Sequence, residues 1–300
     1  MGGSDIAVRS ISDGIDVWMD ELTRVGYVPD LSIATSLHLA RELQRPLLVE
    51  GKPGVGKTVL ATKVADVLSA ELIRLQCYEG LDRNDALYEW DYLRQLLWIR
   101  THEKDYSAKS LDEGVFDKKF LLERPLLKAI SQRESPVLLI DEVDRADEEF
   151  EAFLLEILSE FQVSIPELGT ISAVKKPLVI LTSNRSRSLS DALRRRCLYL
   201  WIDYPGIEKE VAIVRKQLSD IPEKMALQIC KFIAASRNED LDKAPGVSET
   251  VDWSTALMAL HLDKLEPDIV LQTIGTIIKD ADDLEKFRIN TIERIIQTIG

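Results

Sequence analysis

The chain alternates between short, continuously apolar segments and longer segments whose apolar residues recur at helical spacing. The short segments, which are predicted strands, are residues 47–49, 71–75, 136–140, 177–182 and 198–202. Most of them lack polar alternation, which is typical of strands buried on both faces. The pattern therefore predicts a parallel five-stranded sheet between layers of helices, an α/β fold.

The segments around these strands suggest two domains. Residues 4–44 have helical spacing before the first strand, and only helical spacing remains after Pro205. Residues 82–119 are charged, bear aromatics and are too long for a simple connection, so they are predicted to be an insertion. We expect an α/β domain over residues 1–204, with N-terminal helices and this insertion, followed by a small all-helical lid domain over residues 205–300.

Composition narrows the classes of partner. The chain has 300 residues and a formal net charge of -13, so it repels phosphate backbones and anionic lipid. Nucleic acid is therefore not an expected partner. The three cysteines, Cys77, Cys197 and Cys230, are widely spaced, which favours reduced thiols and gives no zinc framework. No basic-then-apolar leader and no apolar run of membrane-spanning length is present, so we expect a cytoplasmic protein without membrane insertion.

Residues 51–58 read Gly-Lys-Pro-Gly-Val-Gly-Lys-Thr and lie between a predicted strand and a predicted helix. This is the context in which a phosphate loop works: glycines let backbone N–H groups wrap the phosphates, Lys57 reaches the β- and γ-phosphates, and the Thr58 hydroxyl binds Mg²⁺. The pattern predicts a nucleoside triphosphate as the ligand, in preference to a simple glycine turn. The predicted nucleotide-binding residues are Gly51, Lys52, Pro53, Gly54, Val55, Gly56, Lys57, Thr58 and Val59.

Two carboxylates follow the third predicted strand. Asp141 and Glu142 emerge at the carboxyl end of a buried strand, where open α/β sheets bind ligands. We predict that Asp141 joins Thr58 in holding Mg²⁺ and that Glu142 activates the attacking water. A solvated acidic turn would look the same in isolation, but the phosphate loop about 85 residues earlier favours the catalytic interpretation.

Two further polar sites follow later strands. Asn184, after the fourth strand, is predicted to contact the γ-phosphate and the attacking water. Three arginines at 194–196 precede the fifth strand. They are either a solvated basic helix end or an arginine finger that neutralises charge on a neighbouring subunit's ATP.

The order of phosphate loop, Asp-Glu strand, Ser-Asn at 183–184, arginine before the last strand and helical lid resembles the AAA+ ATPases, most closely the MoxR family. Residues 182–187, 191–197 and 201–205, with Asp252-Trp253, look like the CoxD branch, accessory ATPases of molybdenum-containing carbon monoxide dehydrogenase. The resemblance implies a homohexameric ring in which Arg196 acts on the adjacent subunit. It also implies a hairpin over 162–174, an insertion that faces the pore or a client, a von Willebrand factor A domain partner, and a metalloenzyme client whose metal–sulfur site is completed.

The chain departs from the family pattern at two places. Family lids often carry a Ser-x-Arg that senses ATP, whereas this chain has Ser248-Glu249-Thr250. Either another cation such as Arg237 or Lys243 substitutes, or the lid is coupled weakly to the nucleotide. Asp144 also replaces an asparagine that is common in the family.

Other functions remain open on the sequence alone. A DNA-remodelling AAA+ ATPase would normally present a basic face, which neither the insertion nor the lid carries. A slowly hydrolysing, nucleotide-gated scaffold is disfavoured by Glu142 and favoured by the missing lid arginine. Within the insertion, Trp90, Tyr92 and Trp98 either grip a client or pack on the core.

Overall fold

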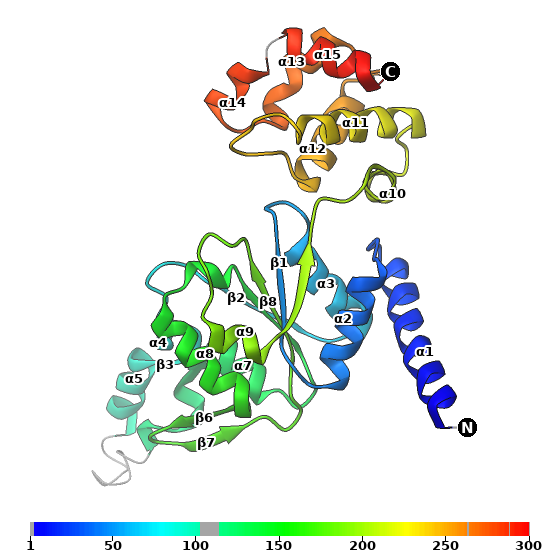
Figure 1. Cartoon of the computed structure of the whole chain (residues 1–300). Helices are drawn as coiled ribbons and strands as arrows, with labels where there is room; N and C mark the ends of the chain where they lie inside the picture. The colour runs from blue at the N-terminus through cyan, green and yellow to red at the C-terminus, as the bar shows by residue number, and fades with distance from the viewer. Residues whose placement is uncertain (1–2, 103–113, 263, 288, 300) are drawn as a thin grey trace. The chain divides into compact units, whose positions relative to one another are not determined.

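The five predicted strands form one parallel sheet (Figure 1). A computed structural model describes residues 3–102, 114–262, 264–287 and 289–299. The sheet order is β2-β5-β8-β1-β9. The strands are β1 (Leu47–Gly51), β2 (Leu72–Gln76), β5 (Val137–Asp141), β8 (Leu178–Ser183) and β9 (Leu198–Ile202). The register places Leu47 opposite Ile180, and Val137 opposite both Leu178 and Leu72. The α/β fold predicted from the apolar segments is confirmed.

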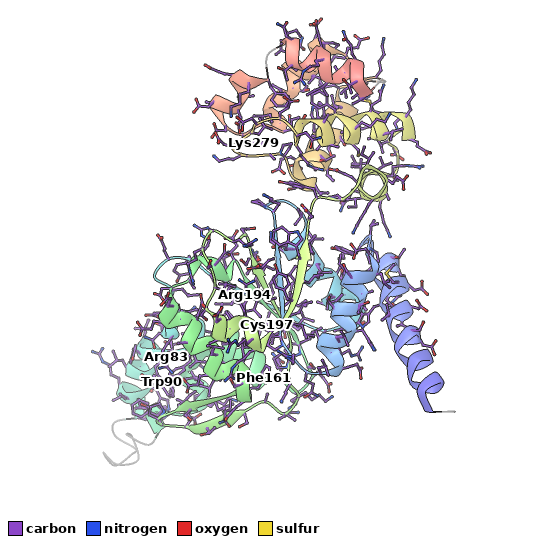
Figure 2. The ribbon with its side chains drawn as sticks, viewed as in Figure 1. Arg83, Trp90, Phe161, Arg194, Cys197 and Lys279 are labelled. Atoms are coloured by element: carbon purple, nitrogen blue, oxygen red, sulfur yellow. The ribbon has the colours of Figure 1, made fainter. Side chains whose placement is uncertain are left out.

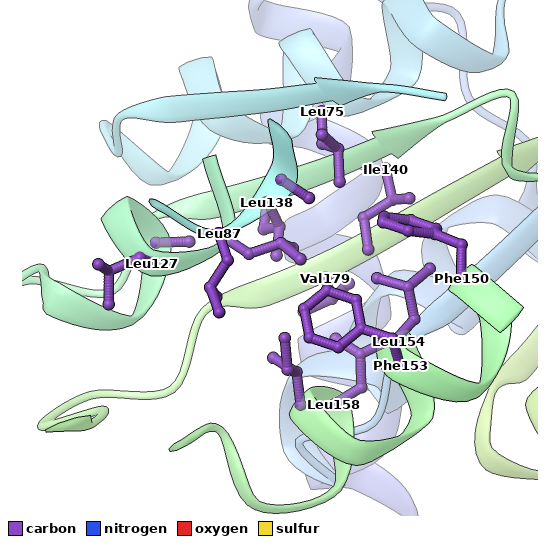
Figure 3. Close-up of a cluster of buried hydrophobic side chains, with 14 of the residues drawn as sticks. Leu75, Leu87, Leu127, Leu138, Ile140, Phe150, Phe153, Leu154, Leu158 and Val179 are labelled. Atoms are coloured by element: carbon purple, nitrogen blue, oxygen red, sulfur yellow. The ribbon is translucent and has the colours of Figure 1, made fainter. Parts of the chain in front are cut away.

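One face of the sheet is covered by helices from the middle of the chain. These are α7 (Pro125–Ser131), α8 (Glu148–Glu160) and α9 (Asp191–Arg196). Their apolar residues join side chains of the sheet in one buried cluster, shown in Figure 3 with Leu127 of α7, Phe150, Phe153, Leu154 and Leu158 of α8, and Leu138, Ile140 and Val179 of the sheet. Burial of the apolar surface of these side chains is the main favourable contribution to the folding free energy of the domain.

The opposite face of the sheet is equally buried. Alternate residues of the same strands, such as Val49, Leu139 and Ile180, point away from the cluster and are 0% exposed. Figure 1 shows α2 (Leu31–Glu42) and residues 61–68 of α3 (Lys57–Leu68) on this side. Burial on both faces explains why the strands read as continuous apolar runs.

The predicted insertion contains short elements. They are α4 (Arg83–Ala86), β3 (Tyr88–Trp90), α5 (Tyr92–His102), the short 3₁₀ helix η1 (Lys118–Phe120) and, just beyond, β4 (Leu121–Glu123), which pairs antiparallel with β3. Residues 103–113 lie outside the described part of the chain.

The aromatic residues of this segment divide into two groups. Trp90 is buried and packs edge-on against Phe116, with ring centroids 5.4 Å apart. Trp98 packs edge-on against Phe120 at 5.9 Å. Tyr92, in contrast, is 65% exposed. Of the two interpretations for these aromatics, packing on the core therefore holds for both tryptophans and not for the tyrosine.

The predicted hairpin is present as β6 (Gln162–Ile165) and β7 (Gly169–Ser172), which pair antiparallel. Gly169 has φ +80°, a conformation that favours glycine, and lies opposite Ile165 where the turn closes.

The C-terminal region is all-helical. It contains α10 (Ile207–Gln217), α11 (Glu223–Ser236), α12 (Val247–Ala259), α13 (Pro267–Thr273), the short 3₁₀ helix η3 (Ile274–Thr276), α14 (Ala281–Lys286) and α15 (Ile289–Ile299). This region has its own hydrophobic core, which includes Phe232. The ring centroid of Phe232 lies 5.3 Å from that of Trp253 and 6.4 Å from that of Phe287. A separate core is what an independently packed unit requires.

The chain divides into two compact units. The first contains residues 1–18, 31–50 and 61–200, and the second contains residues 19–30, 51–60 and 201–300. The long N-terminal helix α1 (Gly3–Arg24) and α3 each contribute to both units. The second unit thus combines the helical lid with the phosphate-loop segment. The division into domains 1–204 and 205–300 stays a prediction.

Within the described residues, no helix is both long and apolar enough to cross a membrane.

Candidate functional site

The predicted phosphate loop connects β1 to α3. Gly54 and Gly56 have φ of +73° and +90°, the left-handed region in which a side chain would be strained. A Cβ on Gly51 would lie 2.1 Å from the carbonyl oxygen of Ile202, so only glycine fits at that position. The three glycines therefore let the loop adopt a turn that other residues would resist, as phosphate cradling requires.

Lys57 is folded back into the loop. Its Nζ donates to the carbonyl oxygens of Gly51 at 2.9 Å and Lys52 at 2.8 Å, and the residue is only 7% exposed. These contacts fix a buried positive charge inside the turn of the loop. A preorganised cation beside glycine N–H groups fits an anionic polyphosphate.

The loop contacts the start of α12 inside the second unit. The Gly54 carbonyl accepts a hydrogen bond from the Val247 N–H at 2.8 Å, and the Ser248 N–H lies at 3.4 Å. Val247 and Ser248, at the start of α12, therefore touch the phosphate loop through their backbone, and Ser248 is the first residue of the stretch that matches the family's lid sensor.

Asp141 ends β5 and is 2% exposed. The Thr182 hydroxyl of the neighbouring strand β8 donates to Asp141 Oδ1, and Arg74 Nη2 of β2 donates to Oδ2 at 2.6 Å. Residues on both adjacent strands thus orient the carboxylate. Carboxylate and hydroxyl oxygens are hard donors of the kind that Mg²⁺ prefers. The residue types predicted for this ion, Asp141 in the first unit and Thr58 in the second, therefore fit its chemistry.

Glu142 adopts a left-handed backbone conformation, with φ +54° and ψ +48°. Its N–H donates to Thr182 Oγ1 at 2.9 Å, which holds this conformation at the end of the strand. Strained backbone of this kind persists where the surroundings over-determine it, and it clusters at functional sites.

Three side chains hold the Glu142 carboxylate. Asn184 Nδ2 donates to Oε1 at 3.4 Å, Gln76 Nε2 donates to Oε2 at 3.1 Å, and Arg145 lies 3.2 Å from Oε2. Asp141, Glu142 and Asn184, which were predicted to act together, therefore lie at one edge of the sheet in the first unit.

Asp144 anchors the loop that carries Asn184. Its carboxylate accepts hydrogen bonds from the Asn184 N–H at 3.2 Å, the Ser186 N–H at 2.8 Å and the Ser186 hydroxyl at 2.7 Å. A carboxylate offers two oxygens for these three donors. The departure from the family's asparagine therefore keeps, and enlarges, the acceptor at this position.

The three arginines end α9 and are exposed. Figure 2 shows Arg194 and Cys197 close together at this helix end. Arg194 lies over the ring of Tyr199, 5.8 Å from its centroid. Among the contacts described for the first unit, Arg196 makes none with Asp141, Glu142 or Asn184. Its action on a neighbouring subunit stays a prediction.

Arg237 has a structural task inside the lid. Its Nη1 and Nη2 donate to the two carboxylate oxygens of Glu210 at 2.7 Å each, and Nε donates to the Pro245 carbonyl at 2.8 Å. Glu210 is fully buried and also accepts from the Thr250 hydroxyl at 2.6 Å. Lys243 pairs with Asp280 at 3.2 Å. Both cations considered as replacements for the lid arginine are thus paired within the lid.

The sequence did not indicate that four residues orient the site: Arg74, Gln76, Asp144 and Thr182. A weak signal existed for the first two, because Arg74 and Gln76 alternate with buried Ile73 and Leu75 along β2. This alternation puts both polar side chains on one face at the carboxyl end of a strand.

A parallel sheet with a phosphate loop after β1, paired acidic residues at the end of β5 and a polar residue after β8 defines an AAA+ P-loop NTPase. Residues 46–197, slightly more than half of the chain, match the AAA domain (dynein-related subfamily). The chain therefore belongs to this family of AAA+ ATPases, whose fold implies nucleotide binding.

Known proteins resemble the chain over various lengths. An uncharacterized protein of Staphylococcus aureus (strain bovine RF122 / ET3-1) is 28% identical over 228 residues, which is 73% of this chain and 78% of that protein. The Lon protease of Cytophaga hutchinsonii is 28% identical over 192 residues, 61% of this chain but 20% of the protease. Among solved structures, the RuvB Holliday junction branch migration motor of Thermotoga maritima has a TM-score of 0.47 and 21% identity, covering 84% of this chain and 68% of that chain.

Proposed function

We propose that the protein hydrolyses ATP. The observation that carries this proposal is the Glu142 carboxylate, which Asn184 and Gln76 hold beside the partnered carboxylate of Asp141. A general base must have a fixed orientation toward the proton it removes. Two amides, one on each oxygen, give Glu142 that orientation.

The other predicted residues have complementary tasks in this reaction. Lys57 and the backbone N–H groups of residues 51–59 bind the phosphates of the substrate. Asn184 orients the attacking water together with Glu142. Thr58 and Asp141 would hold Mg²⁺, which would neutralise part of the phosphate charge when bound. Arg196 of a neighbouring subunit stabilises the charge that develops on the γ-phosphate.

Two variants test the proposal. Lys57→Ala should lose tight ATP binding because the buried positive charge is removed, whereas Glu142→Gln should bind ATP and not turn it over. The matched controls are Lys63→Ala, half-buried on the same helix and paired with Asp66, and Glu149→Gln, exposed in the first turn of α8. Hydrolysis by Glu142→Gln within a few-fold of wild type would refute the role given to Glu142.

We further propose that the reaction remodels a protein client, as in MoxR-type ATPases, which the matched family includes. The net charge of -13 supports a protein over a nucleic acid partner, because binding a phosphate backbone would be unfavourable. The resemblance to the CoxD branch supports a molybdenum metalloenzyme such as carbon monoxide dehydrogenase as the client, with a von Willebrand factor A domain protein as adaptor. The proposed working form is a homohexameric ring in the cytoplasm.

A trap variant tests the class of client. Glu142→Gln, held in the ATP state, is used to capture partners from extract of the source cells, and Lys57→Ala serves as the control that cannot reach that state. Enrichment of a metalloenzyme precursor or its adaptor by the trap alone supports the proposal. Recovery of nucleic acid instead favours a DNA-remodelling ATPase.

A second candidate, the slowly hydrolysing scaffold, is supported by the lid. Within the described residues of the lid, Arg237 forms an ion pair with Glu210, and no arginine takes the place of the family's sensor. Steady-state ATP hydrolysis with and without the captured client separates the two functions. A rate that stays near background in both conditions would favour the scaffold.

A further inference from the structure

The start of α9 is fixed to α8 by buried polar contacts. The Ser190 hydroxyl accepts from the Leu193 N–H at 3.3 Å and caps the helix. The Ser190 N–H donates to Glu151 at 2.9 Å, and Glu151, which is fully buried, also pairs with Arg187. These contacts fix the amino end of α9. They do not involve its carboxyl end.

The end of α9 is held by Arg45. Its Nη2 donates to the carbonyl oxygens of Arg195 at 2.7 Å and Cys197 at 3.3 Å, and its Nε donates to the carbonyl oxygen of Arg196 at 3.2 Å. The last carbonyls of a helix have no partner within the helix and need one from elsewhere. A guanidinium presents several donors in a fixed fork, so one side chain satisfies three carbonyls at once.

The side chain of Arg196 has no comparable support. Within the described part of the chain it is exposed and makes no ion pair, whereas Arg194 lies over the Tyr199 ring and Tyr199 in turn donates to the buried Glu50 at 3.0 Å. The direction in which Arg196 leaves the helix is therefore set by its backbone, and Arg45 binds that backbone at the Arg196 carbonyl itself.

We propose that Arg45 is a positioning residue for the arginine finger: it fixes the α9 carboxyl end so that Arg196 reaches a neighbouring subunit's ATP. The inference rests on the proposed role of Arg196 in ATP hydrolysis. Arg45 touches neither nucleotide nor reacting atoms in this role. Its effect is carried entirely through three backbone carbonyls of the segment that bears the finger.

Removal of the Arg45 side chain should leave the sheet folded. The next residue, Pro46, accepts the Leu198 N–H at 2.8 Å, so the start of β9 stays bonded to the start of β1 when the Arg45 side chain is removed. Arg45 also lines a cavity of about 650 Å³ together with Arg41, Lys175 and Lys176. A small cation in solution can enter a cavity of this size.

The first experiment measures steady-state hydrolysis by Arg45→Ala, with Arg41→Ala as the matched control from the rim of the same cavity. Arg45→Ala should lower kcat by about 10- to 100-fold, because a catalytic group displaced by about 1 Å loses activity on this scale. KM should change by less than about twofold, because the nucleotide loop is untouched. Arg41→Ala should behave as wild type. A kcat for Arg45→Ala within twofold of wild type would overturn the proposal.

The second experiment asks on which side of a subunit interface the defect lies. Arg45→Ala subunits keep Glu142 and lack a placed finger, whereas Glu142→Gln subunits have the finger and lack the base. Mixed rings should recover hydrolysis where an intact Glu142 meets an intact Arg45–Arg196 pair, as they should for Arg196→Ala in the same mixture. Absence of recovery with Arg45→Ala, when Arg196→Ala recovers, would show that Arg45 acts on its own subunit's site and would overturn the inference.

Two further measurements remain informative if Arg45→Ala fails to fold. They also show whether a negative result counts against the role of Arg45 or against the role of Arg196. Arg45→Lys keeps a cation that can reach one carbonyl, and low-millimolar guanidinium should raise the rate of Arg45→Ala while equal urea should not. If Arg45→Ala does not fold, the same mixing test on Arg45→Lys decides. If Arg196→Ala itself leaves kcat unchanged, the proposed role of the finger fails; if it lowers kcat and the Arg45 variants do not, only the present inference fails.

Discussion

Gly246, the residue that precedes α12, lies directly against Gly54 of the phosphate loop, with no room for a side chain on either residue. A Cβ on Gly246 would stand 2.7 Å from the Gly54 Cα, and a Cβ on Gly54 would stand 2.9 Å from the Gly246 Cα. The neighbouring Val247 N–H donates to the Gly54 carbonyl at 2.8 Å. This backbone contact links the lid helix to the loop expected to hold the phosphates.

Gly246→Ala should therefore weaken ATP binding. The new Cβ meets backbone atoms, which cannot rotate away, so either the loop or the helix must shift at a cost of about 1–3 kcal/mol. If that cost falls on the loop, the Kd for ATP rises by about tenfold or more. The measurement is isothermal titration calorimetry with a non-hydrolysed ATP analogue. Gly275→Ala is the control, because a Cβ at exposed Gly275 meets nothing within 4 Å; equal affinities for both variants would contradict the prediction.

Asp144→Ala should lower both stability and turnover. It leaves the N–H of half-buried Asn184 and the N–H and hydroxyl of exposed Ser186 without their acceptor. Because water can replace part of what the carboxylate supplies, we expect a loss of about 1–2 kcal/mol in the free energy of unfolding. Because Asn184 would no longer be held in place, kcat should fall by about 10- to 100-fold.

The control for this prediction is Asp144→Asn, which restores the residue common in the resembling family and keeps one oxygen acceptor. It should retain most of the stability and turnover in urea unfolding and steady-state assays. Equal loss in both variants would show that an acceptor oxygen at position 144 is not what positions Asn184.

The sequence predicted the sheet well because each strand carries its own signal. Residues 198–202, for example, form β9 with the predicted bounds, since a continuous apolar run there follows a short basic helix and ends at Asp203. The predicted second strand, at 71–75, is displaced by one residue from β2. That small difference matters, because Gln76 becomes the last residue of the strand and reaches Glu142.

The contacts that orient the site could not be predicted in the same way. Gln76 and Glu142 are 66 residues apart, and Arg45 and Arg196 are 151 residues apart, so their meeting depends on sheet order and register. The left-handed backbone of Glu142 has no local signal either, because it is held by Thr182 of another strand. Residue types marked the chemistry, whereas long-range packing determines which side chains support it.

Arg237→Met should destabilise the lid strongly. It leaves Glu210 as a buried carboxylate without its cation, and breaking a buried pair in this way costs about 3–5 kcal/mol. The double variant Arg237→Met, Glu210→Gln removes the charge as well and should recover part of the loss. Urea unfolding of the four members of this double-mutant cycle measures the coupling.

The same variants test whether Arg237 senses nucleotide. Because the guanidinium is used by Glu210 and the Pro245 carbonyl, the double variant should bind ATP with near wild-type affinity wherever it is folded. A selective loss of ATP affinity in a stably folded double variant would instead restore Arg237 as a sensor.

The three cysteines should be inert in the folded protein and lower its stability at alkaline pH. Burial raises the pKa of Cys77, Cys197 and Cys230 to about 12 in each case, and the carboxylates of Asp141, Asp144 and Glu142 add to the effect on Cys77. In the unfolded chain a thiol ionises near about pH 8.5. Between that pH and about 12 the unfolded state holds fewer protons than the folded state, so stability is complete below about pH 8.5 and falls as the pH rises through this window.

Two measurements check this prediction. The urea midpoint should decrease steadily from pH 8 to pH 10, and a triple Cys→Ala variant should show a shallower decrease. With Ellman's reagent at pH 8, the native thiols should react about 10²-fold or more slowly than the same thiols in denaturant, because only the thiolate is reactive. Rapid reaction of one thiol in the native protein would show that its burial is transient, and Cys77 would then report opening of the strand end that holds Asp141, since its N–H donates to the Asp141 carbonyl at 2.9 Å.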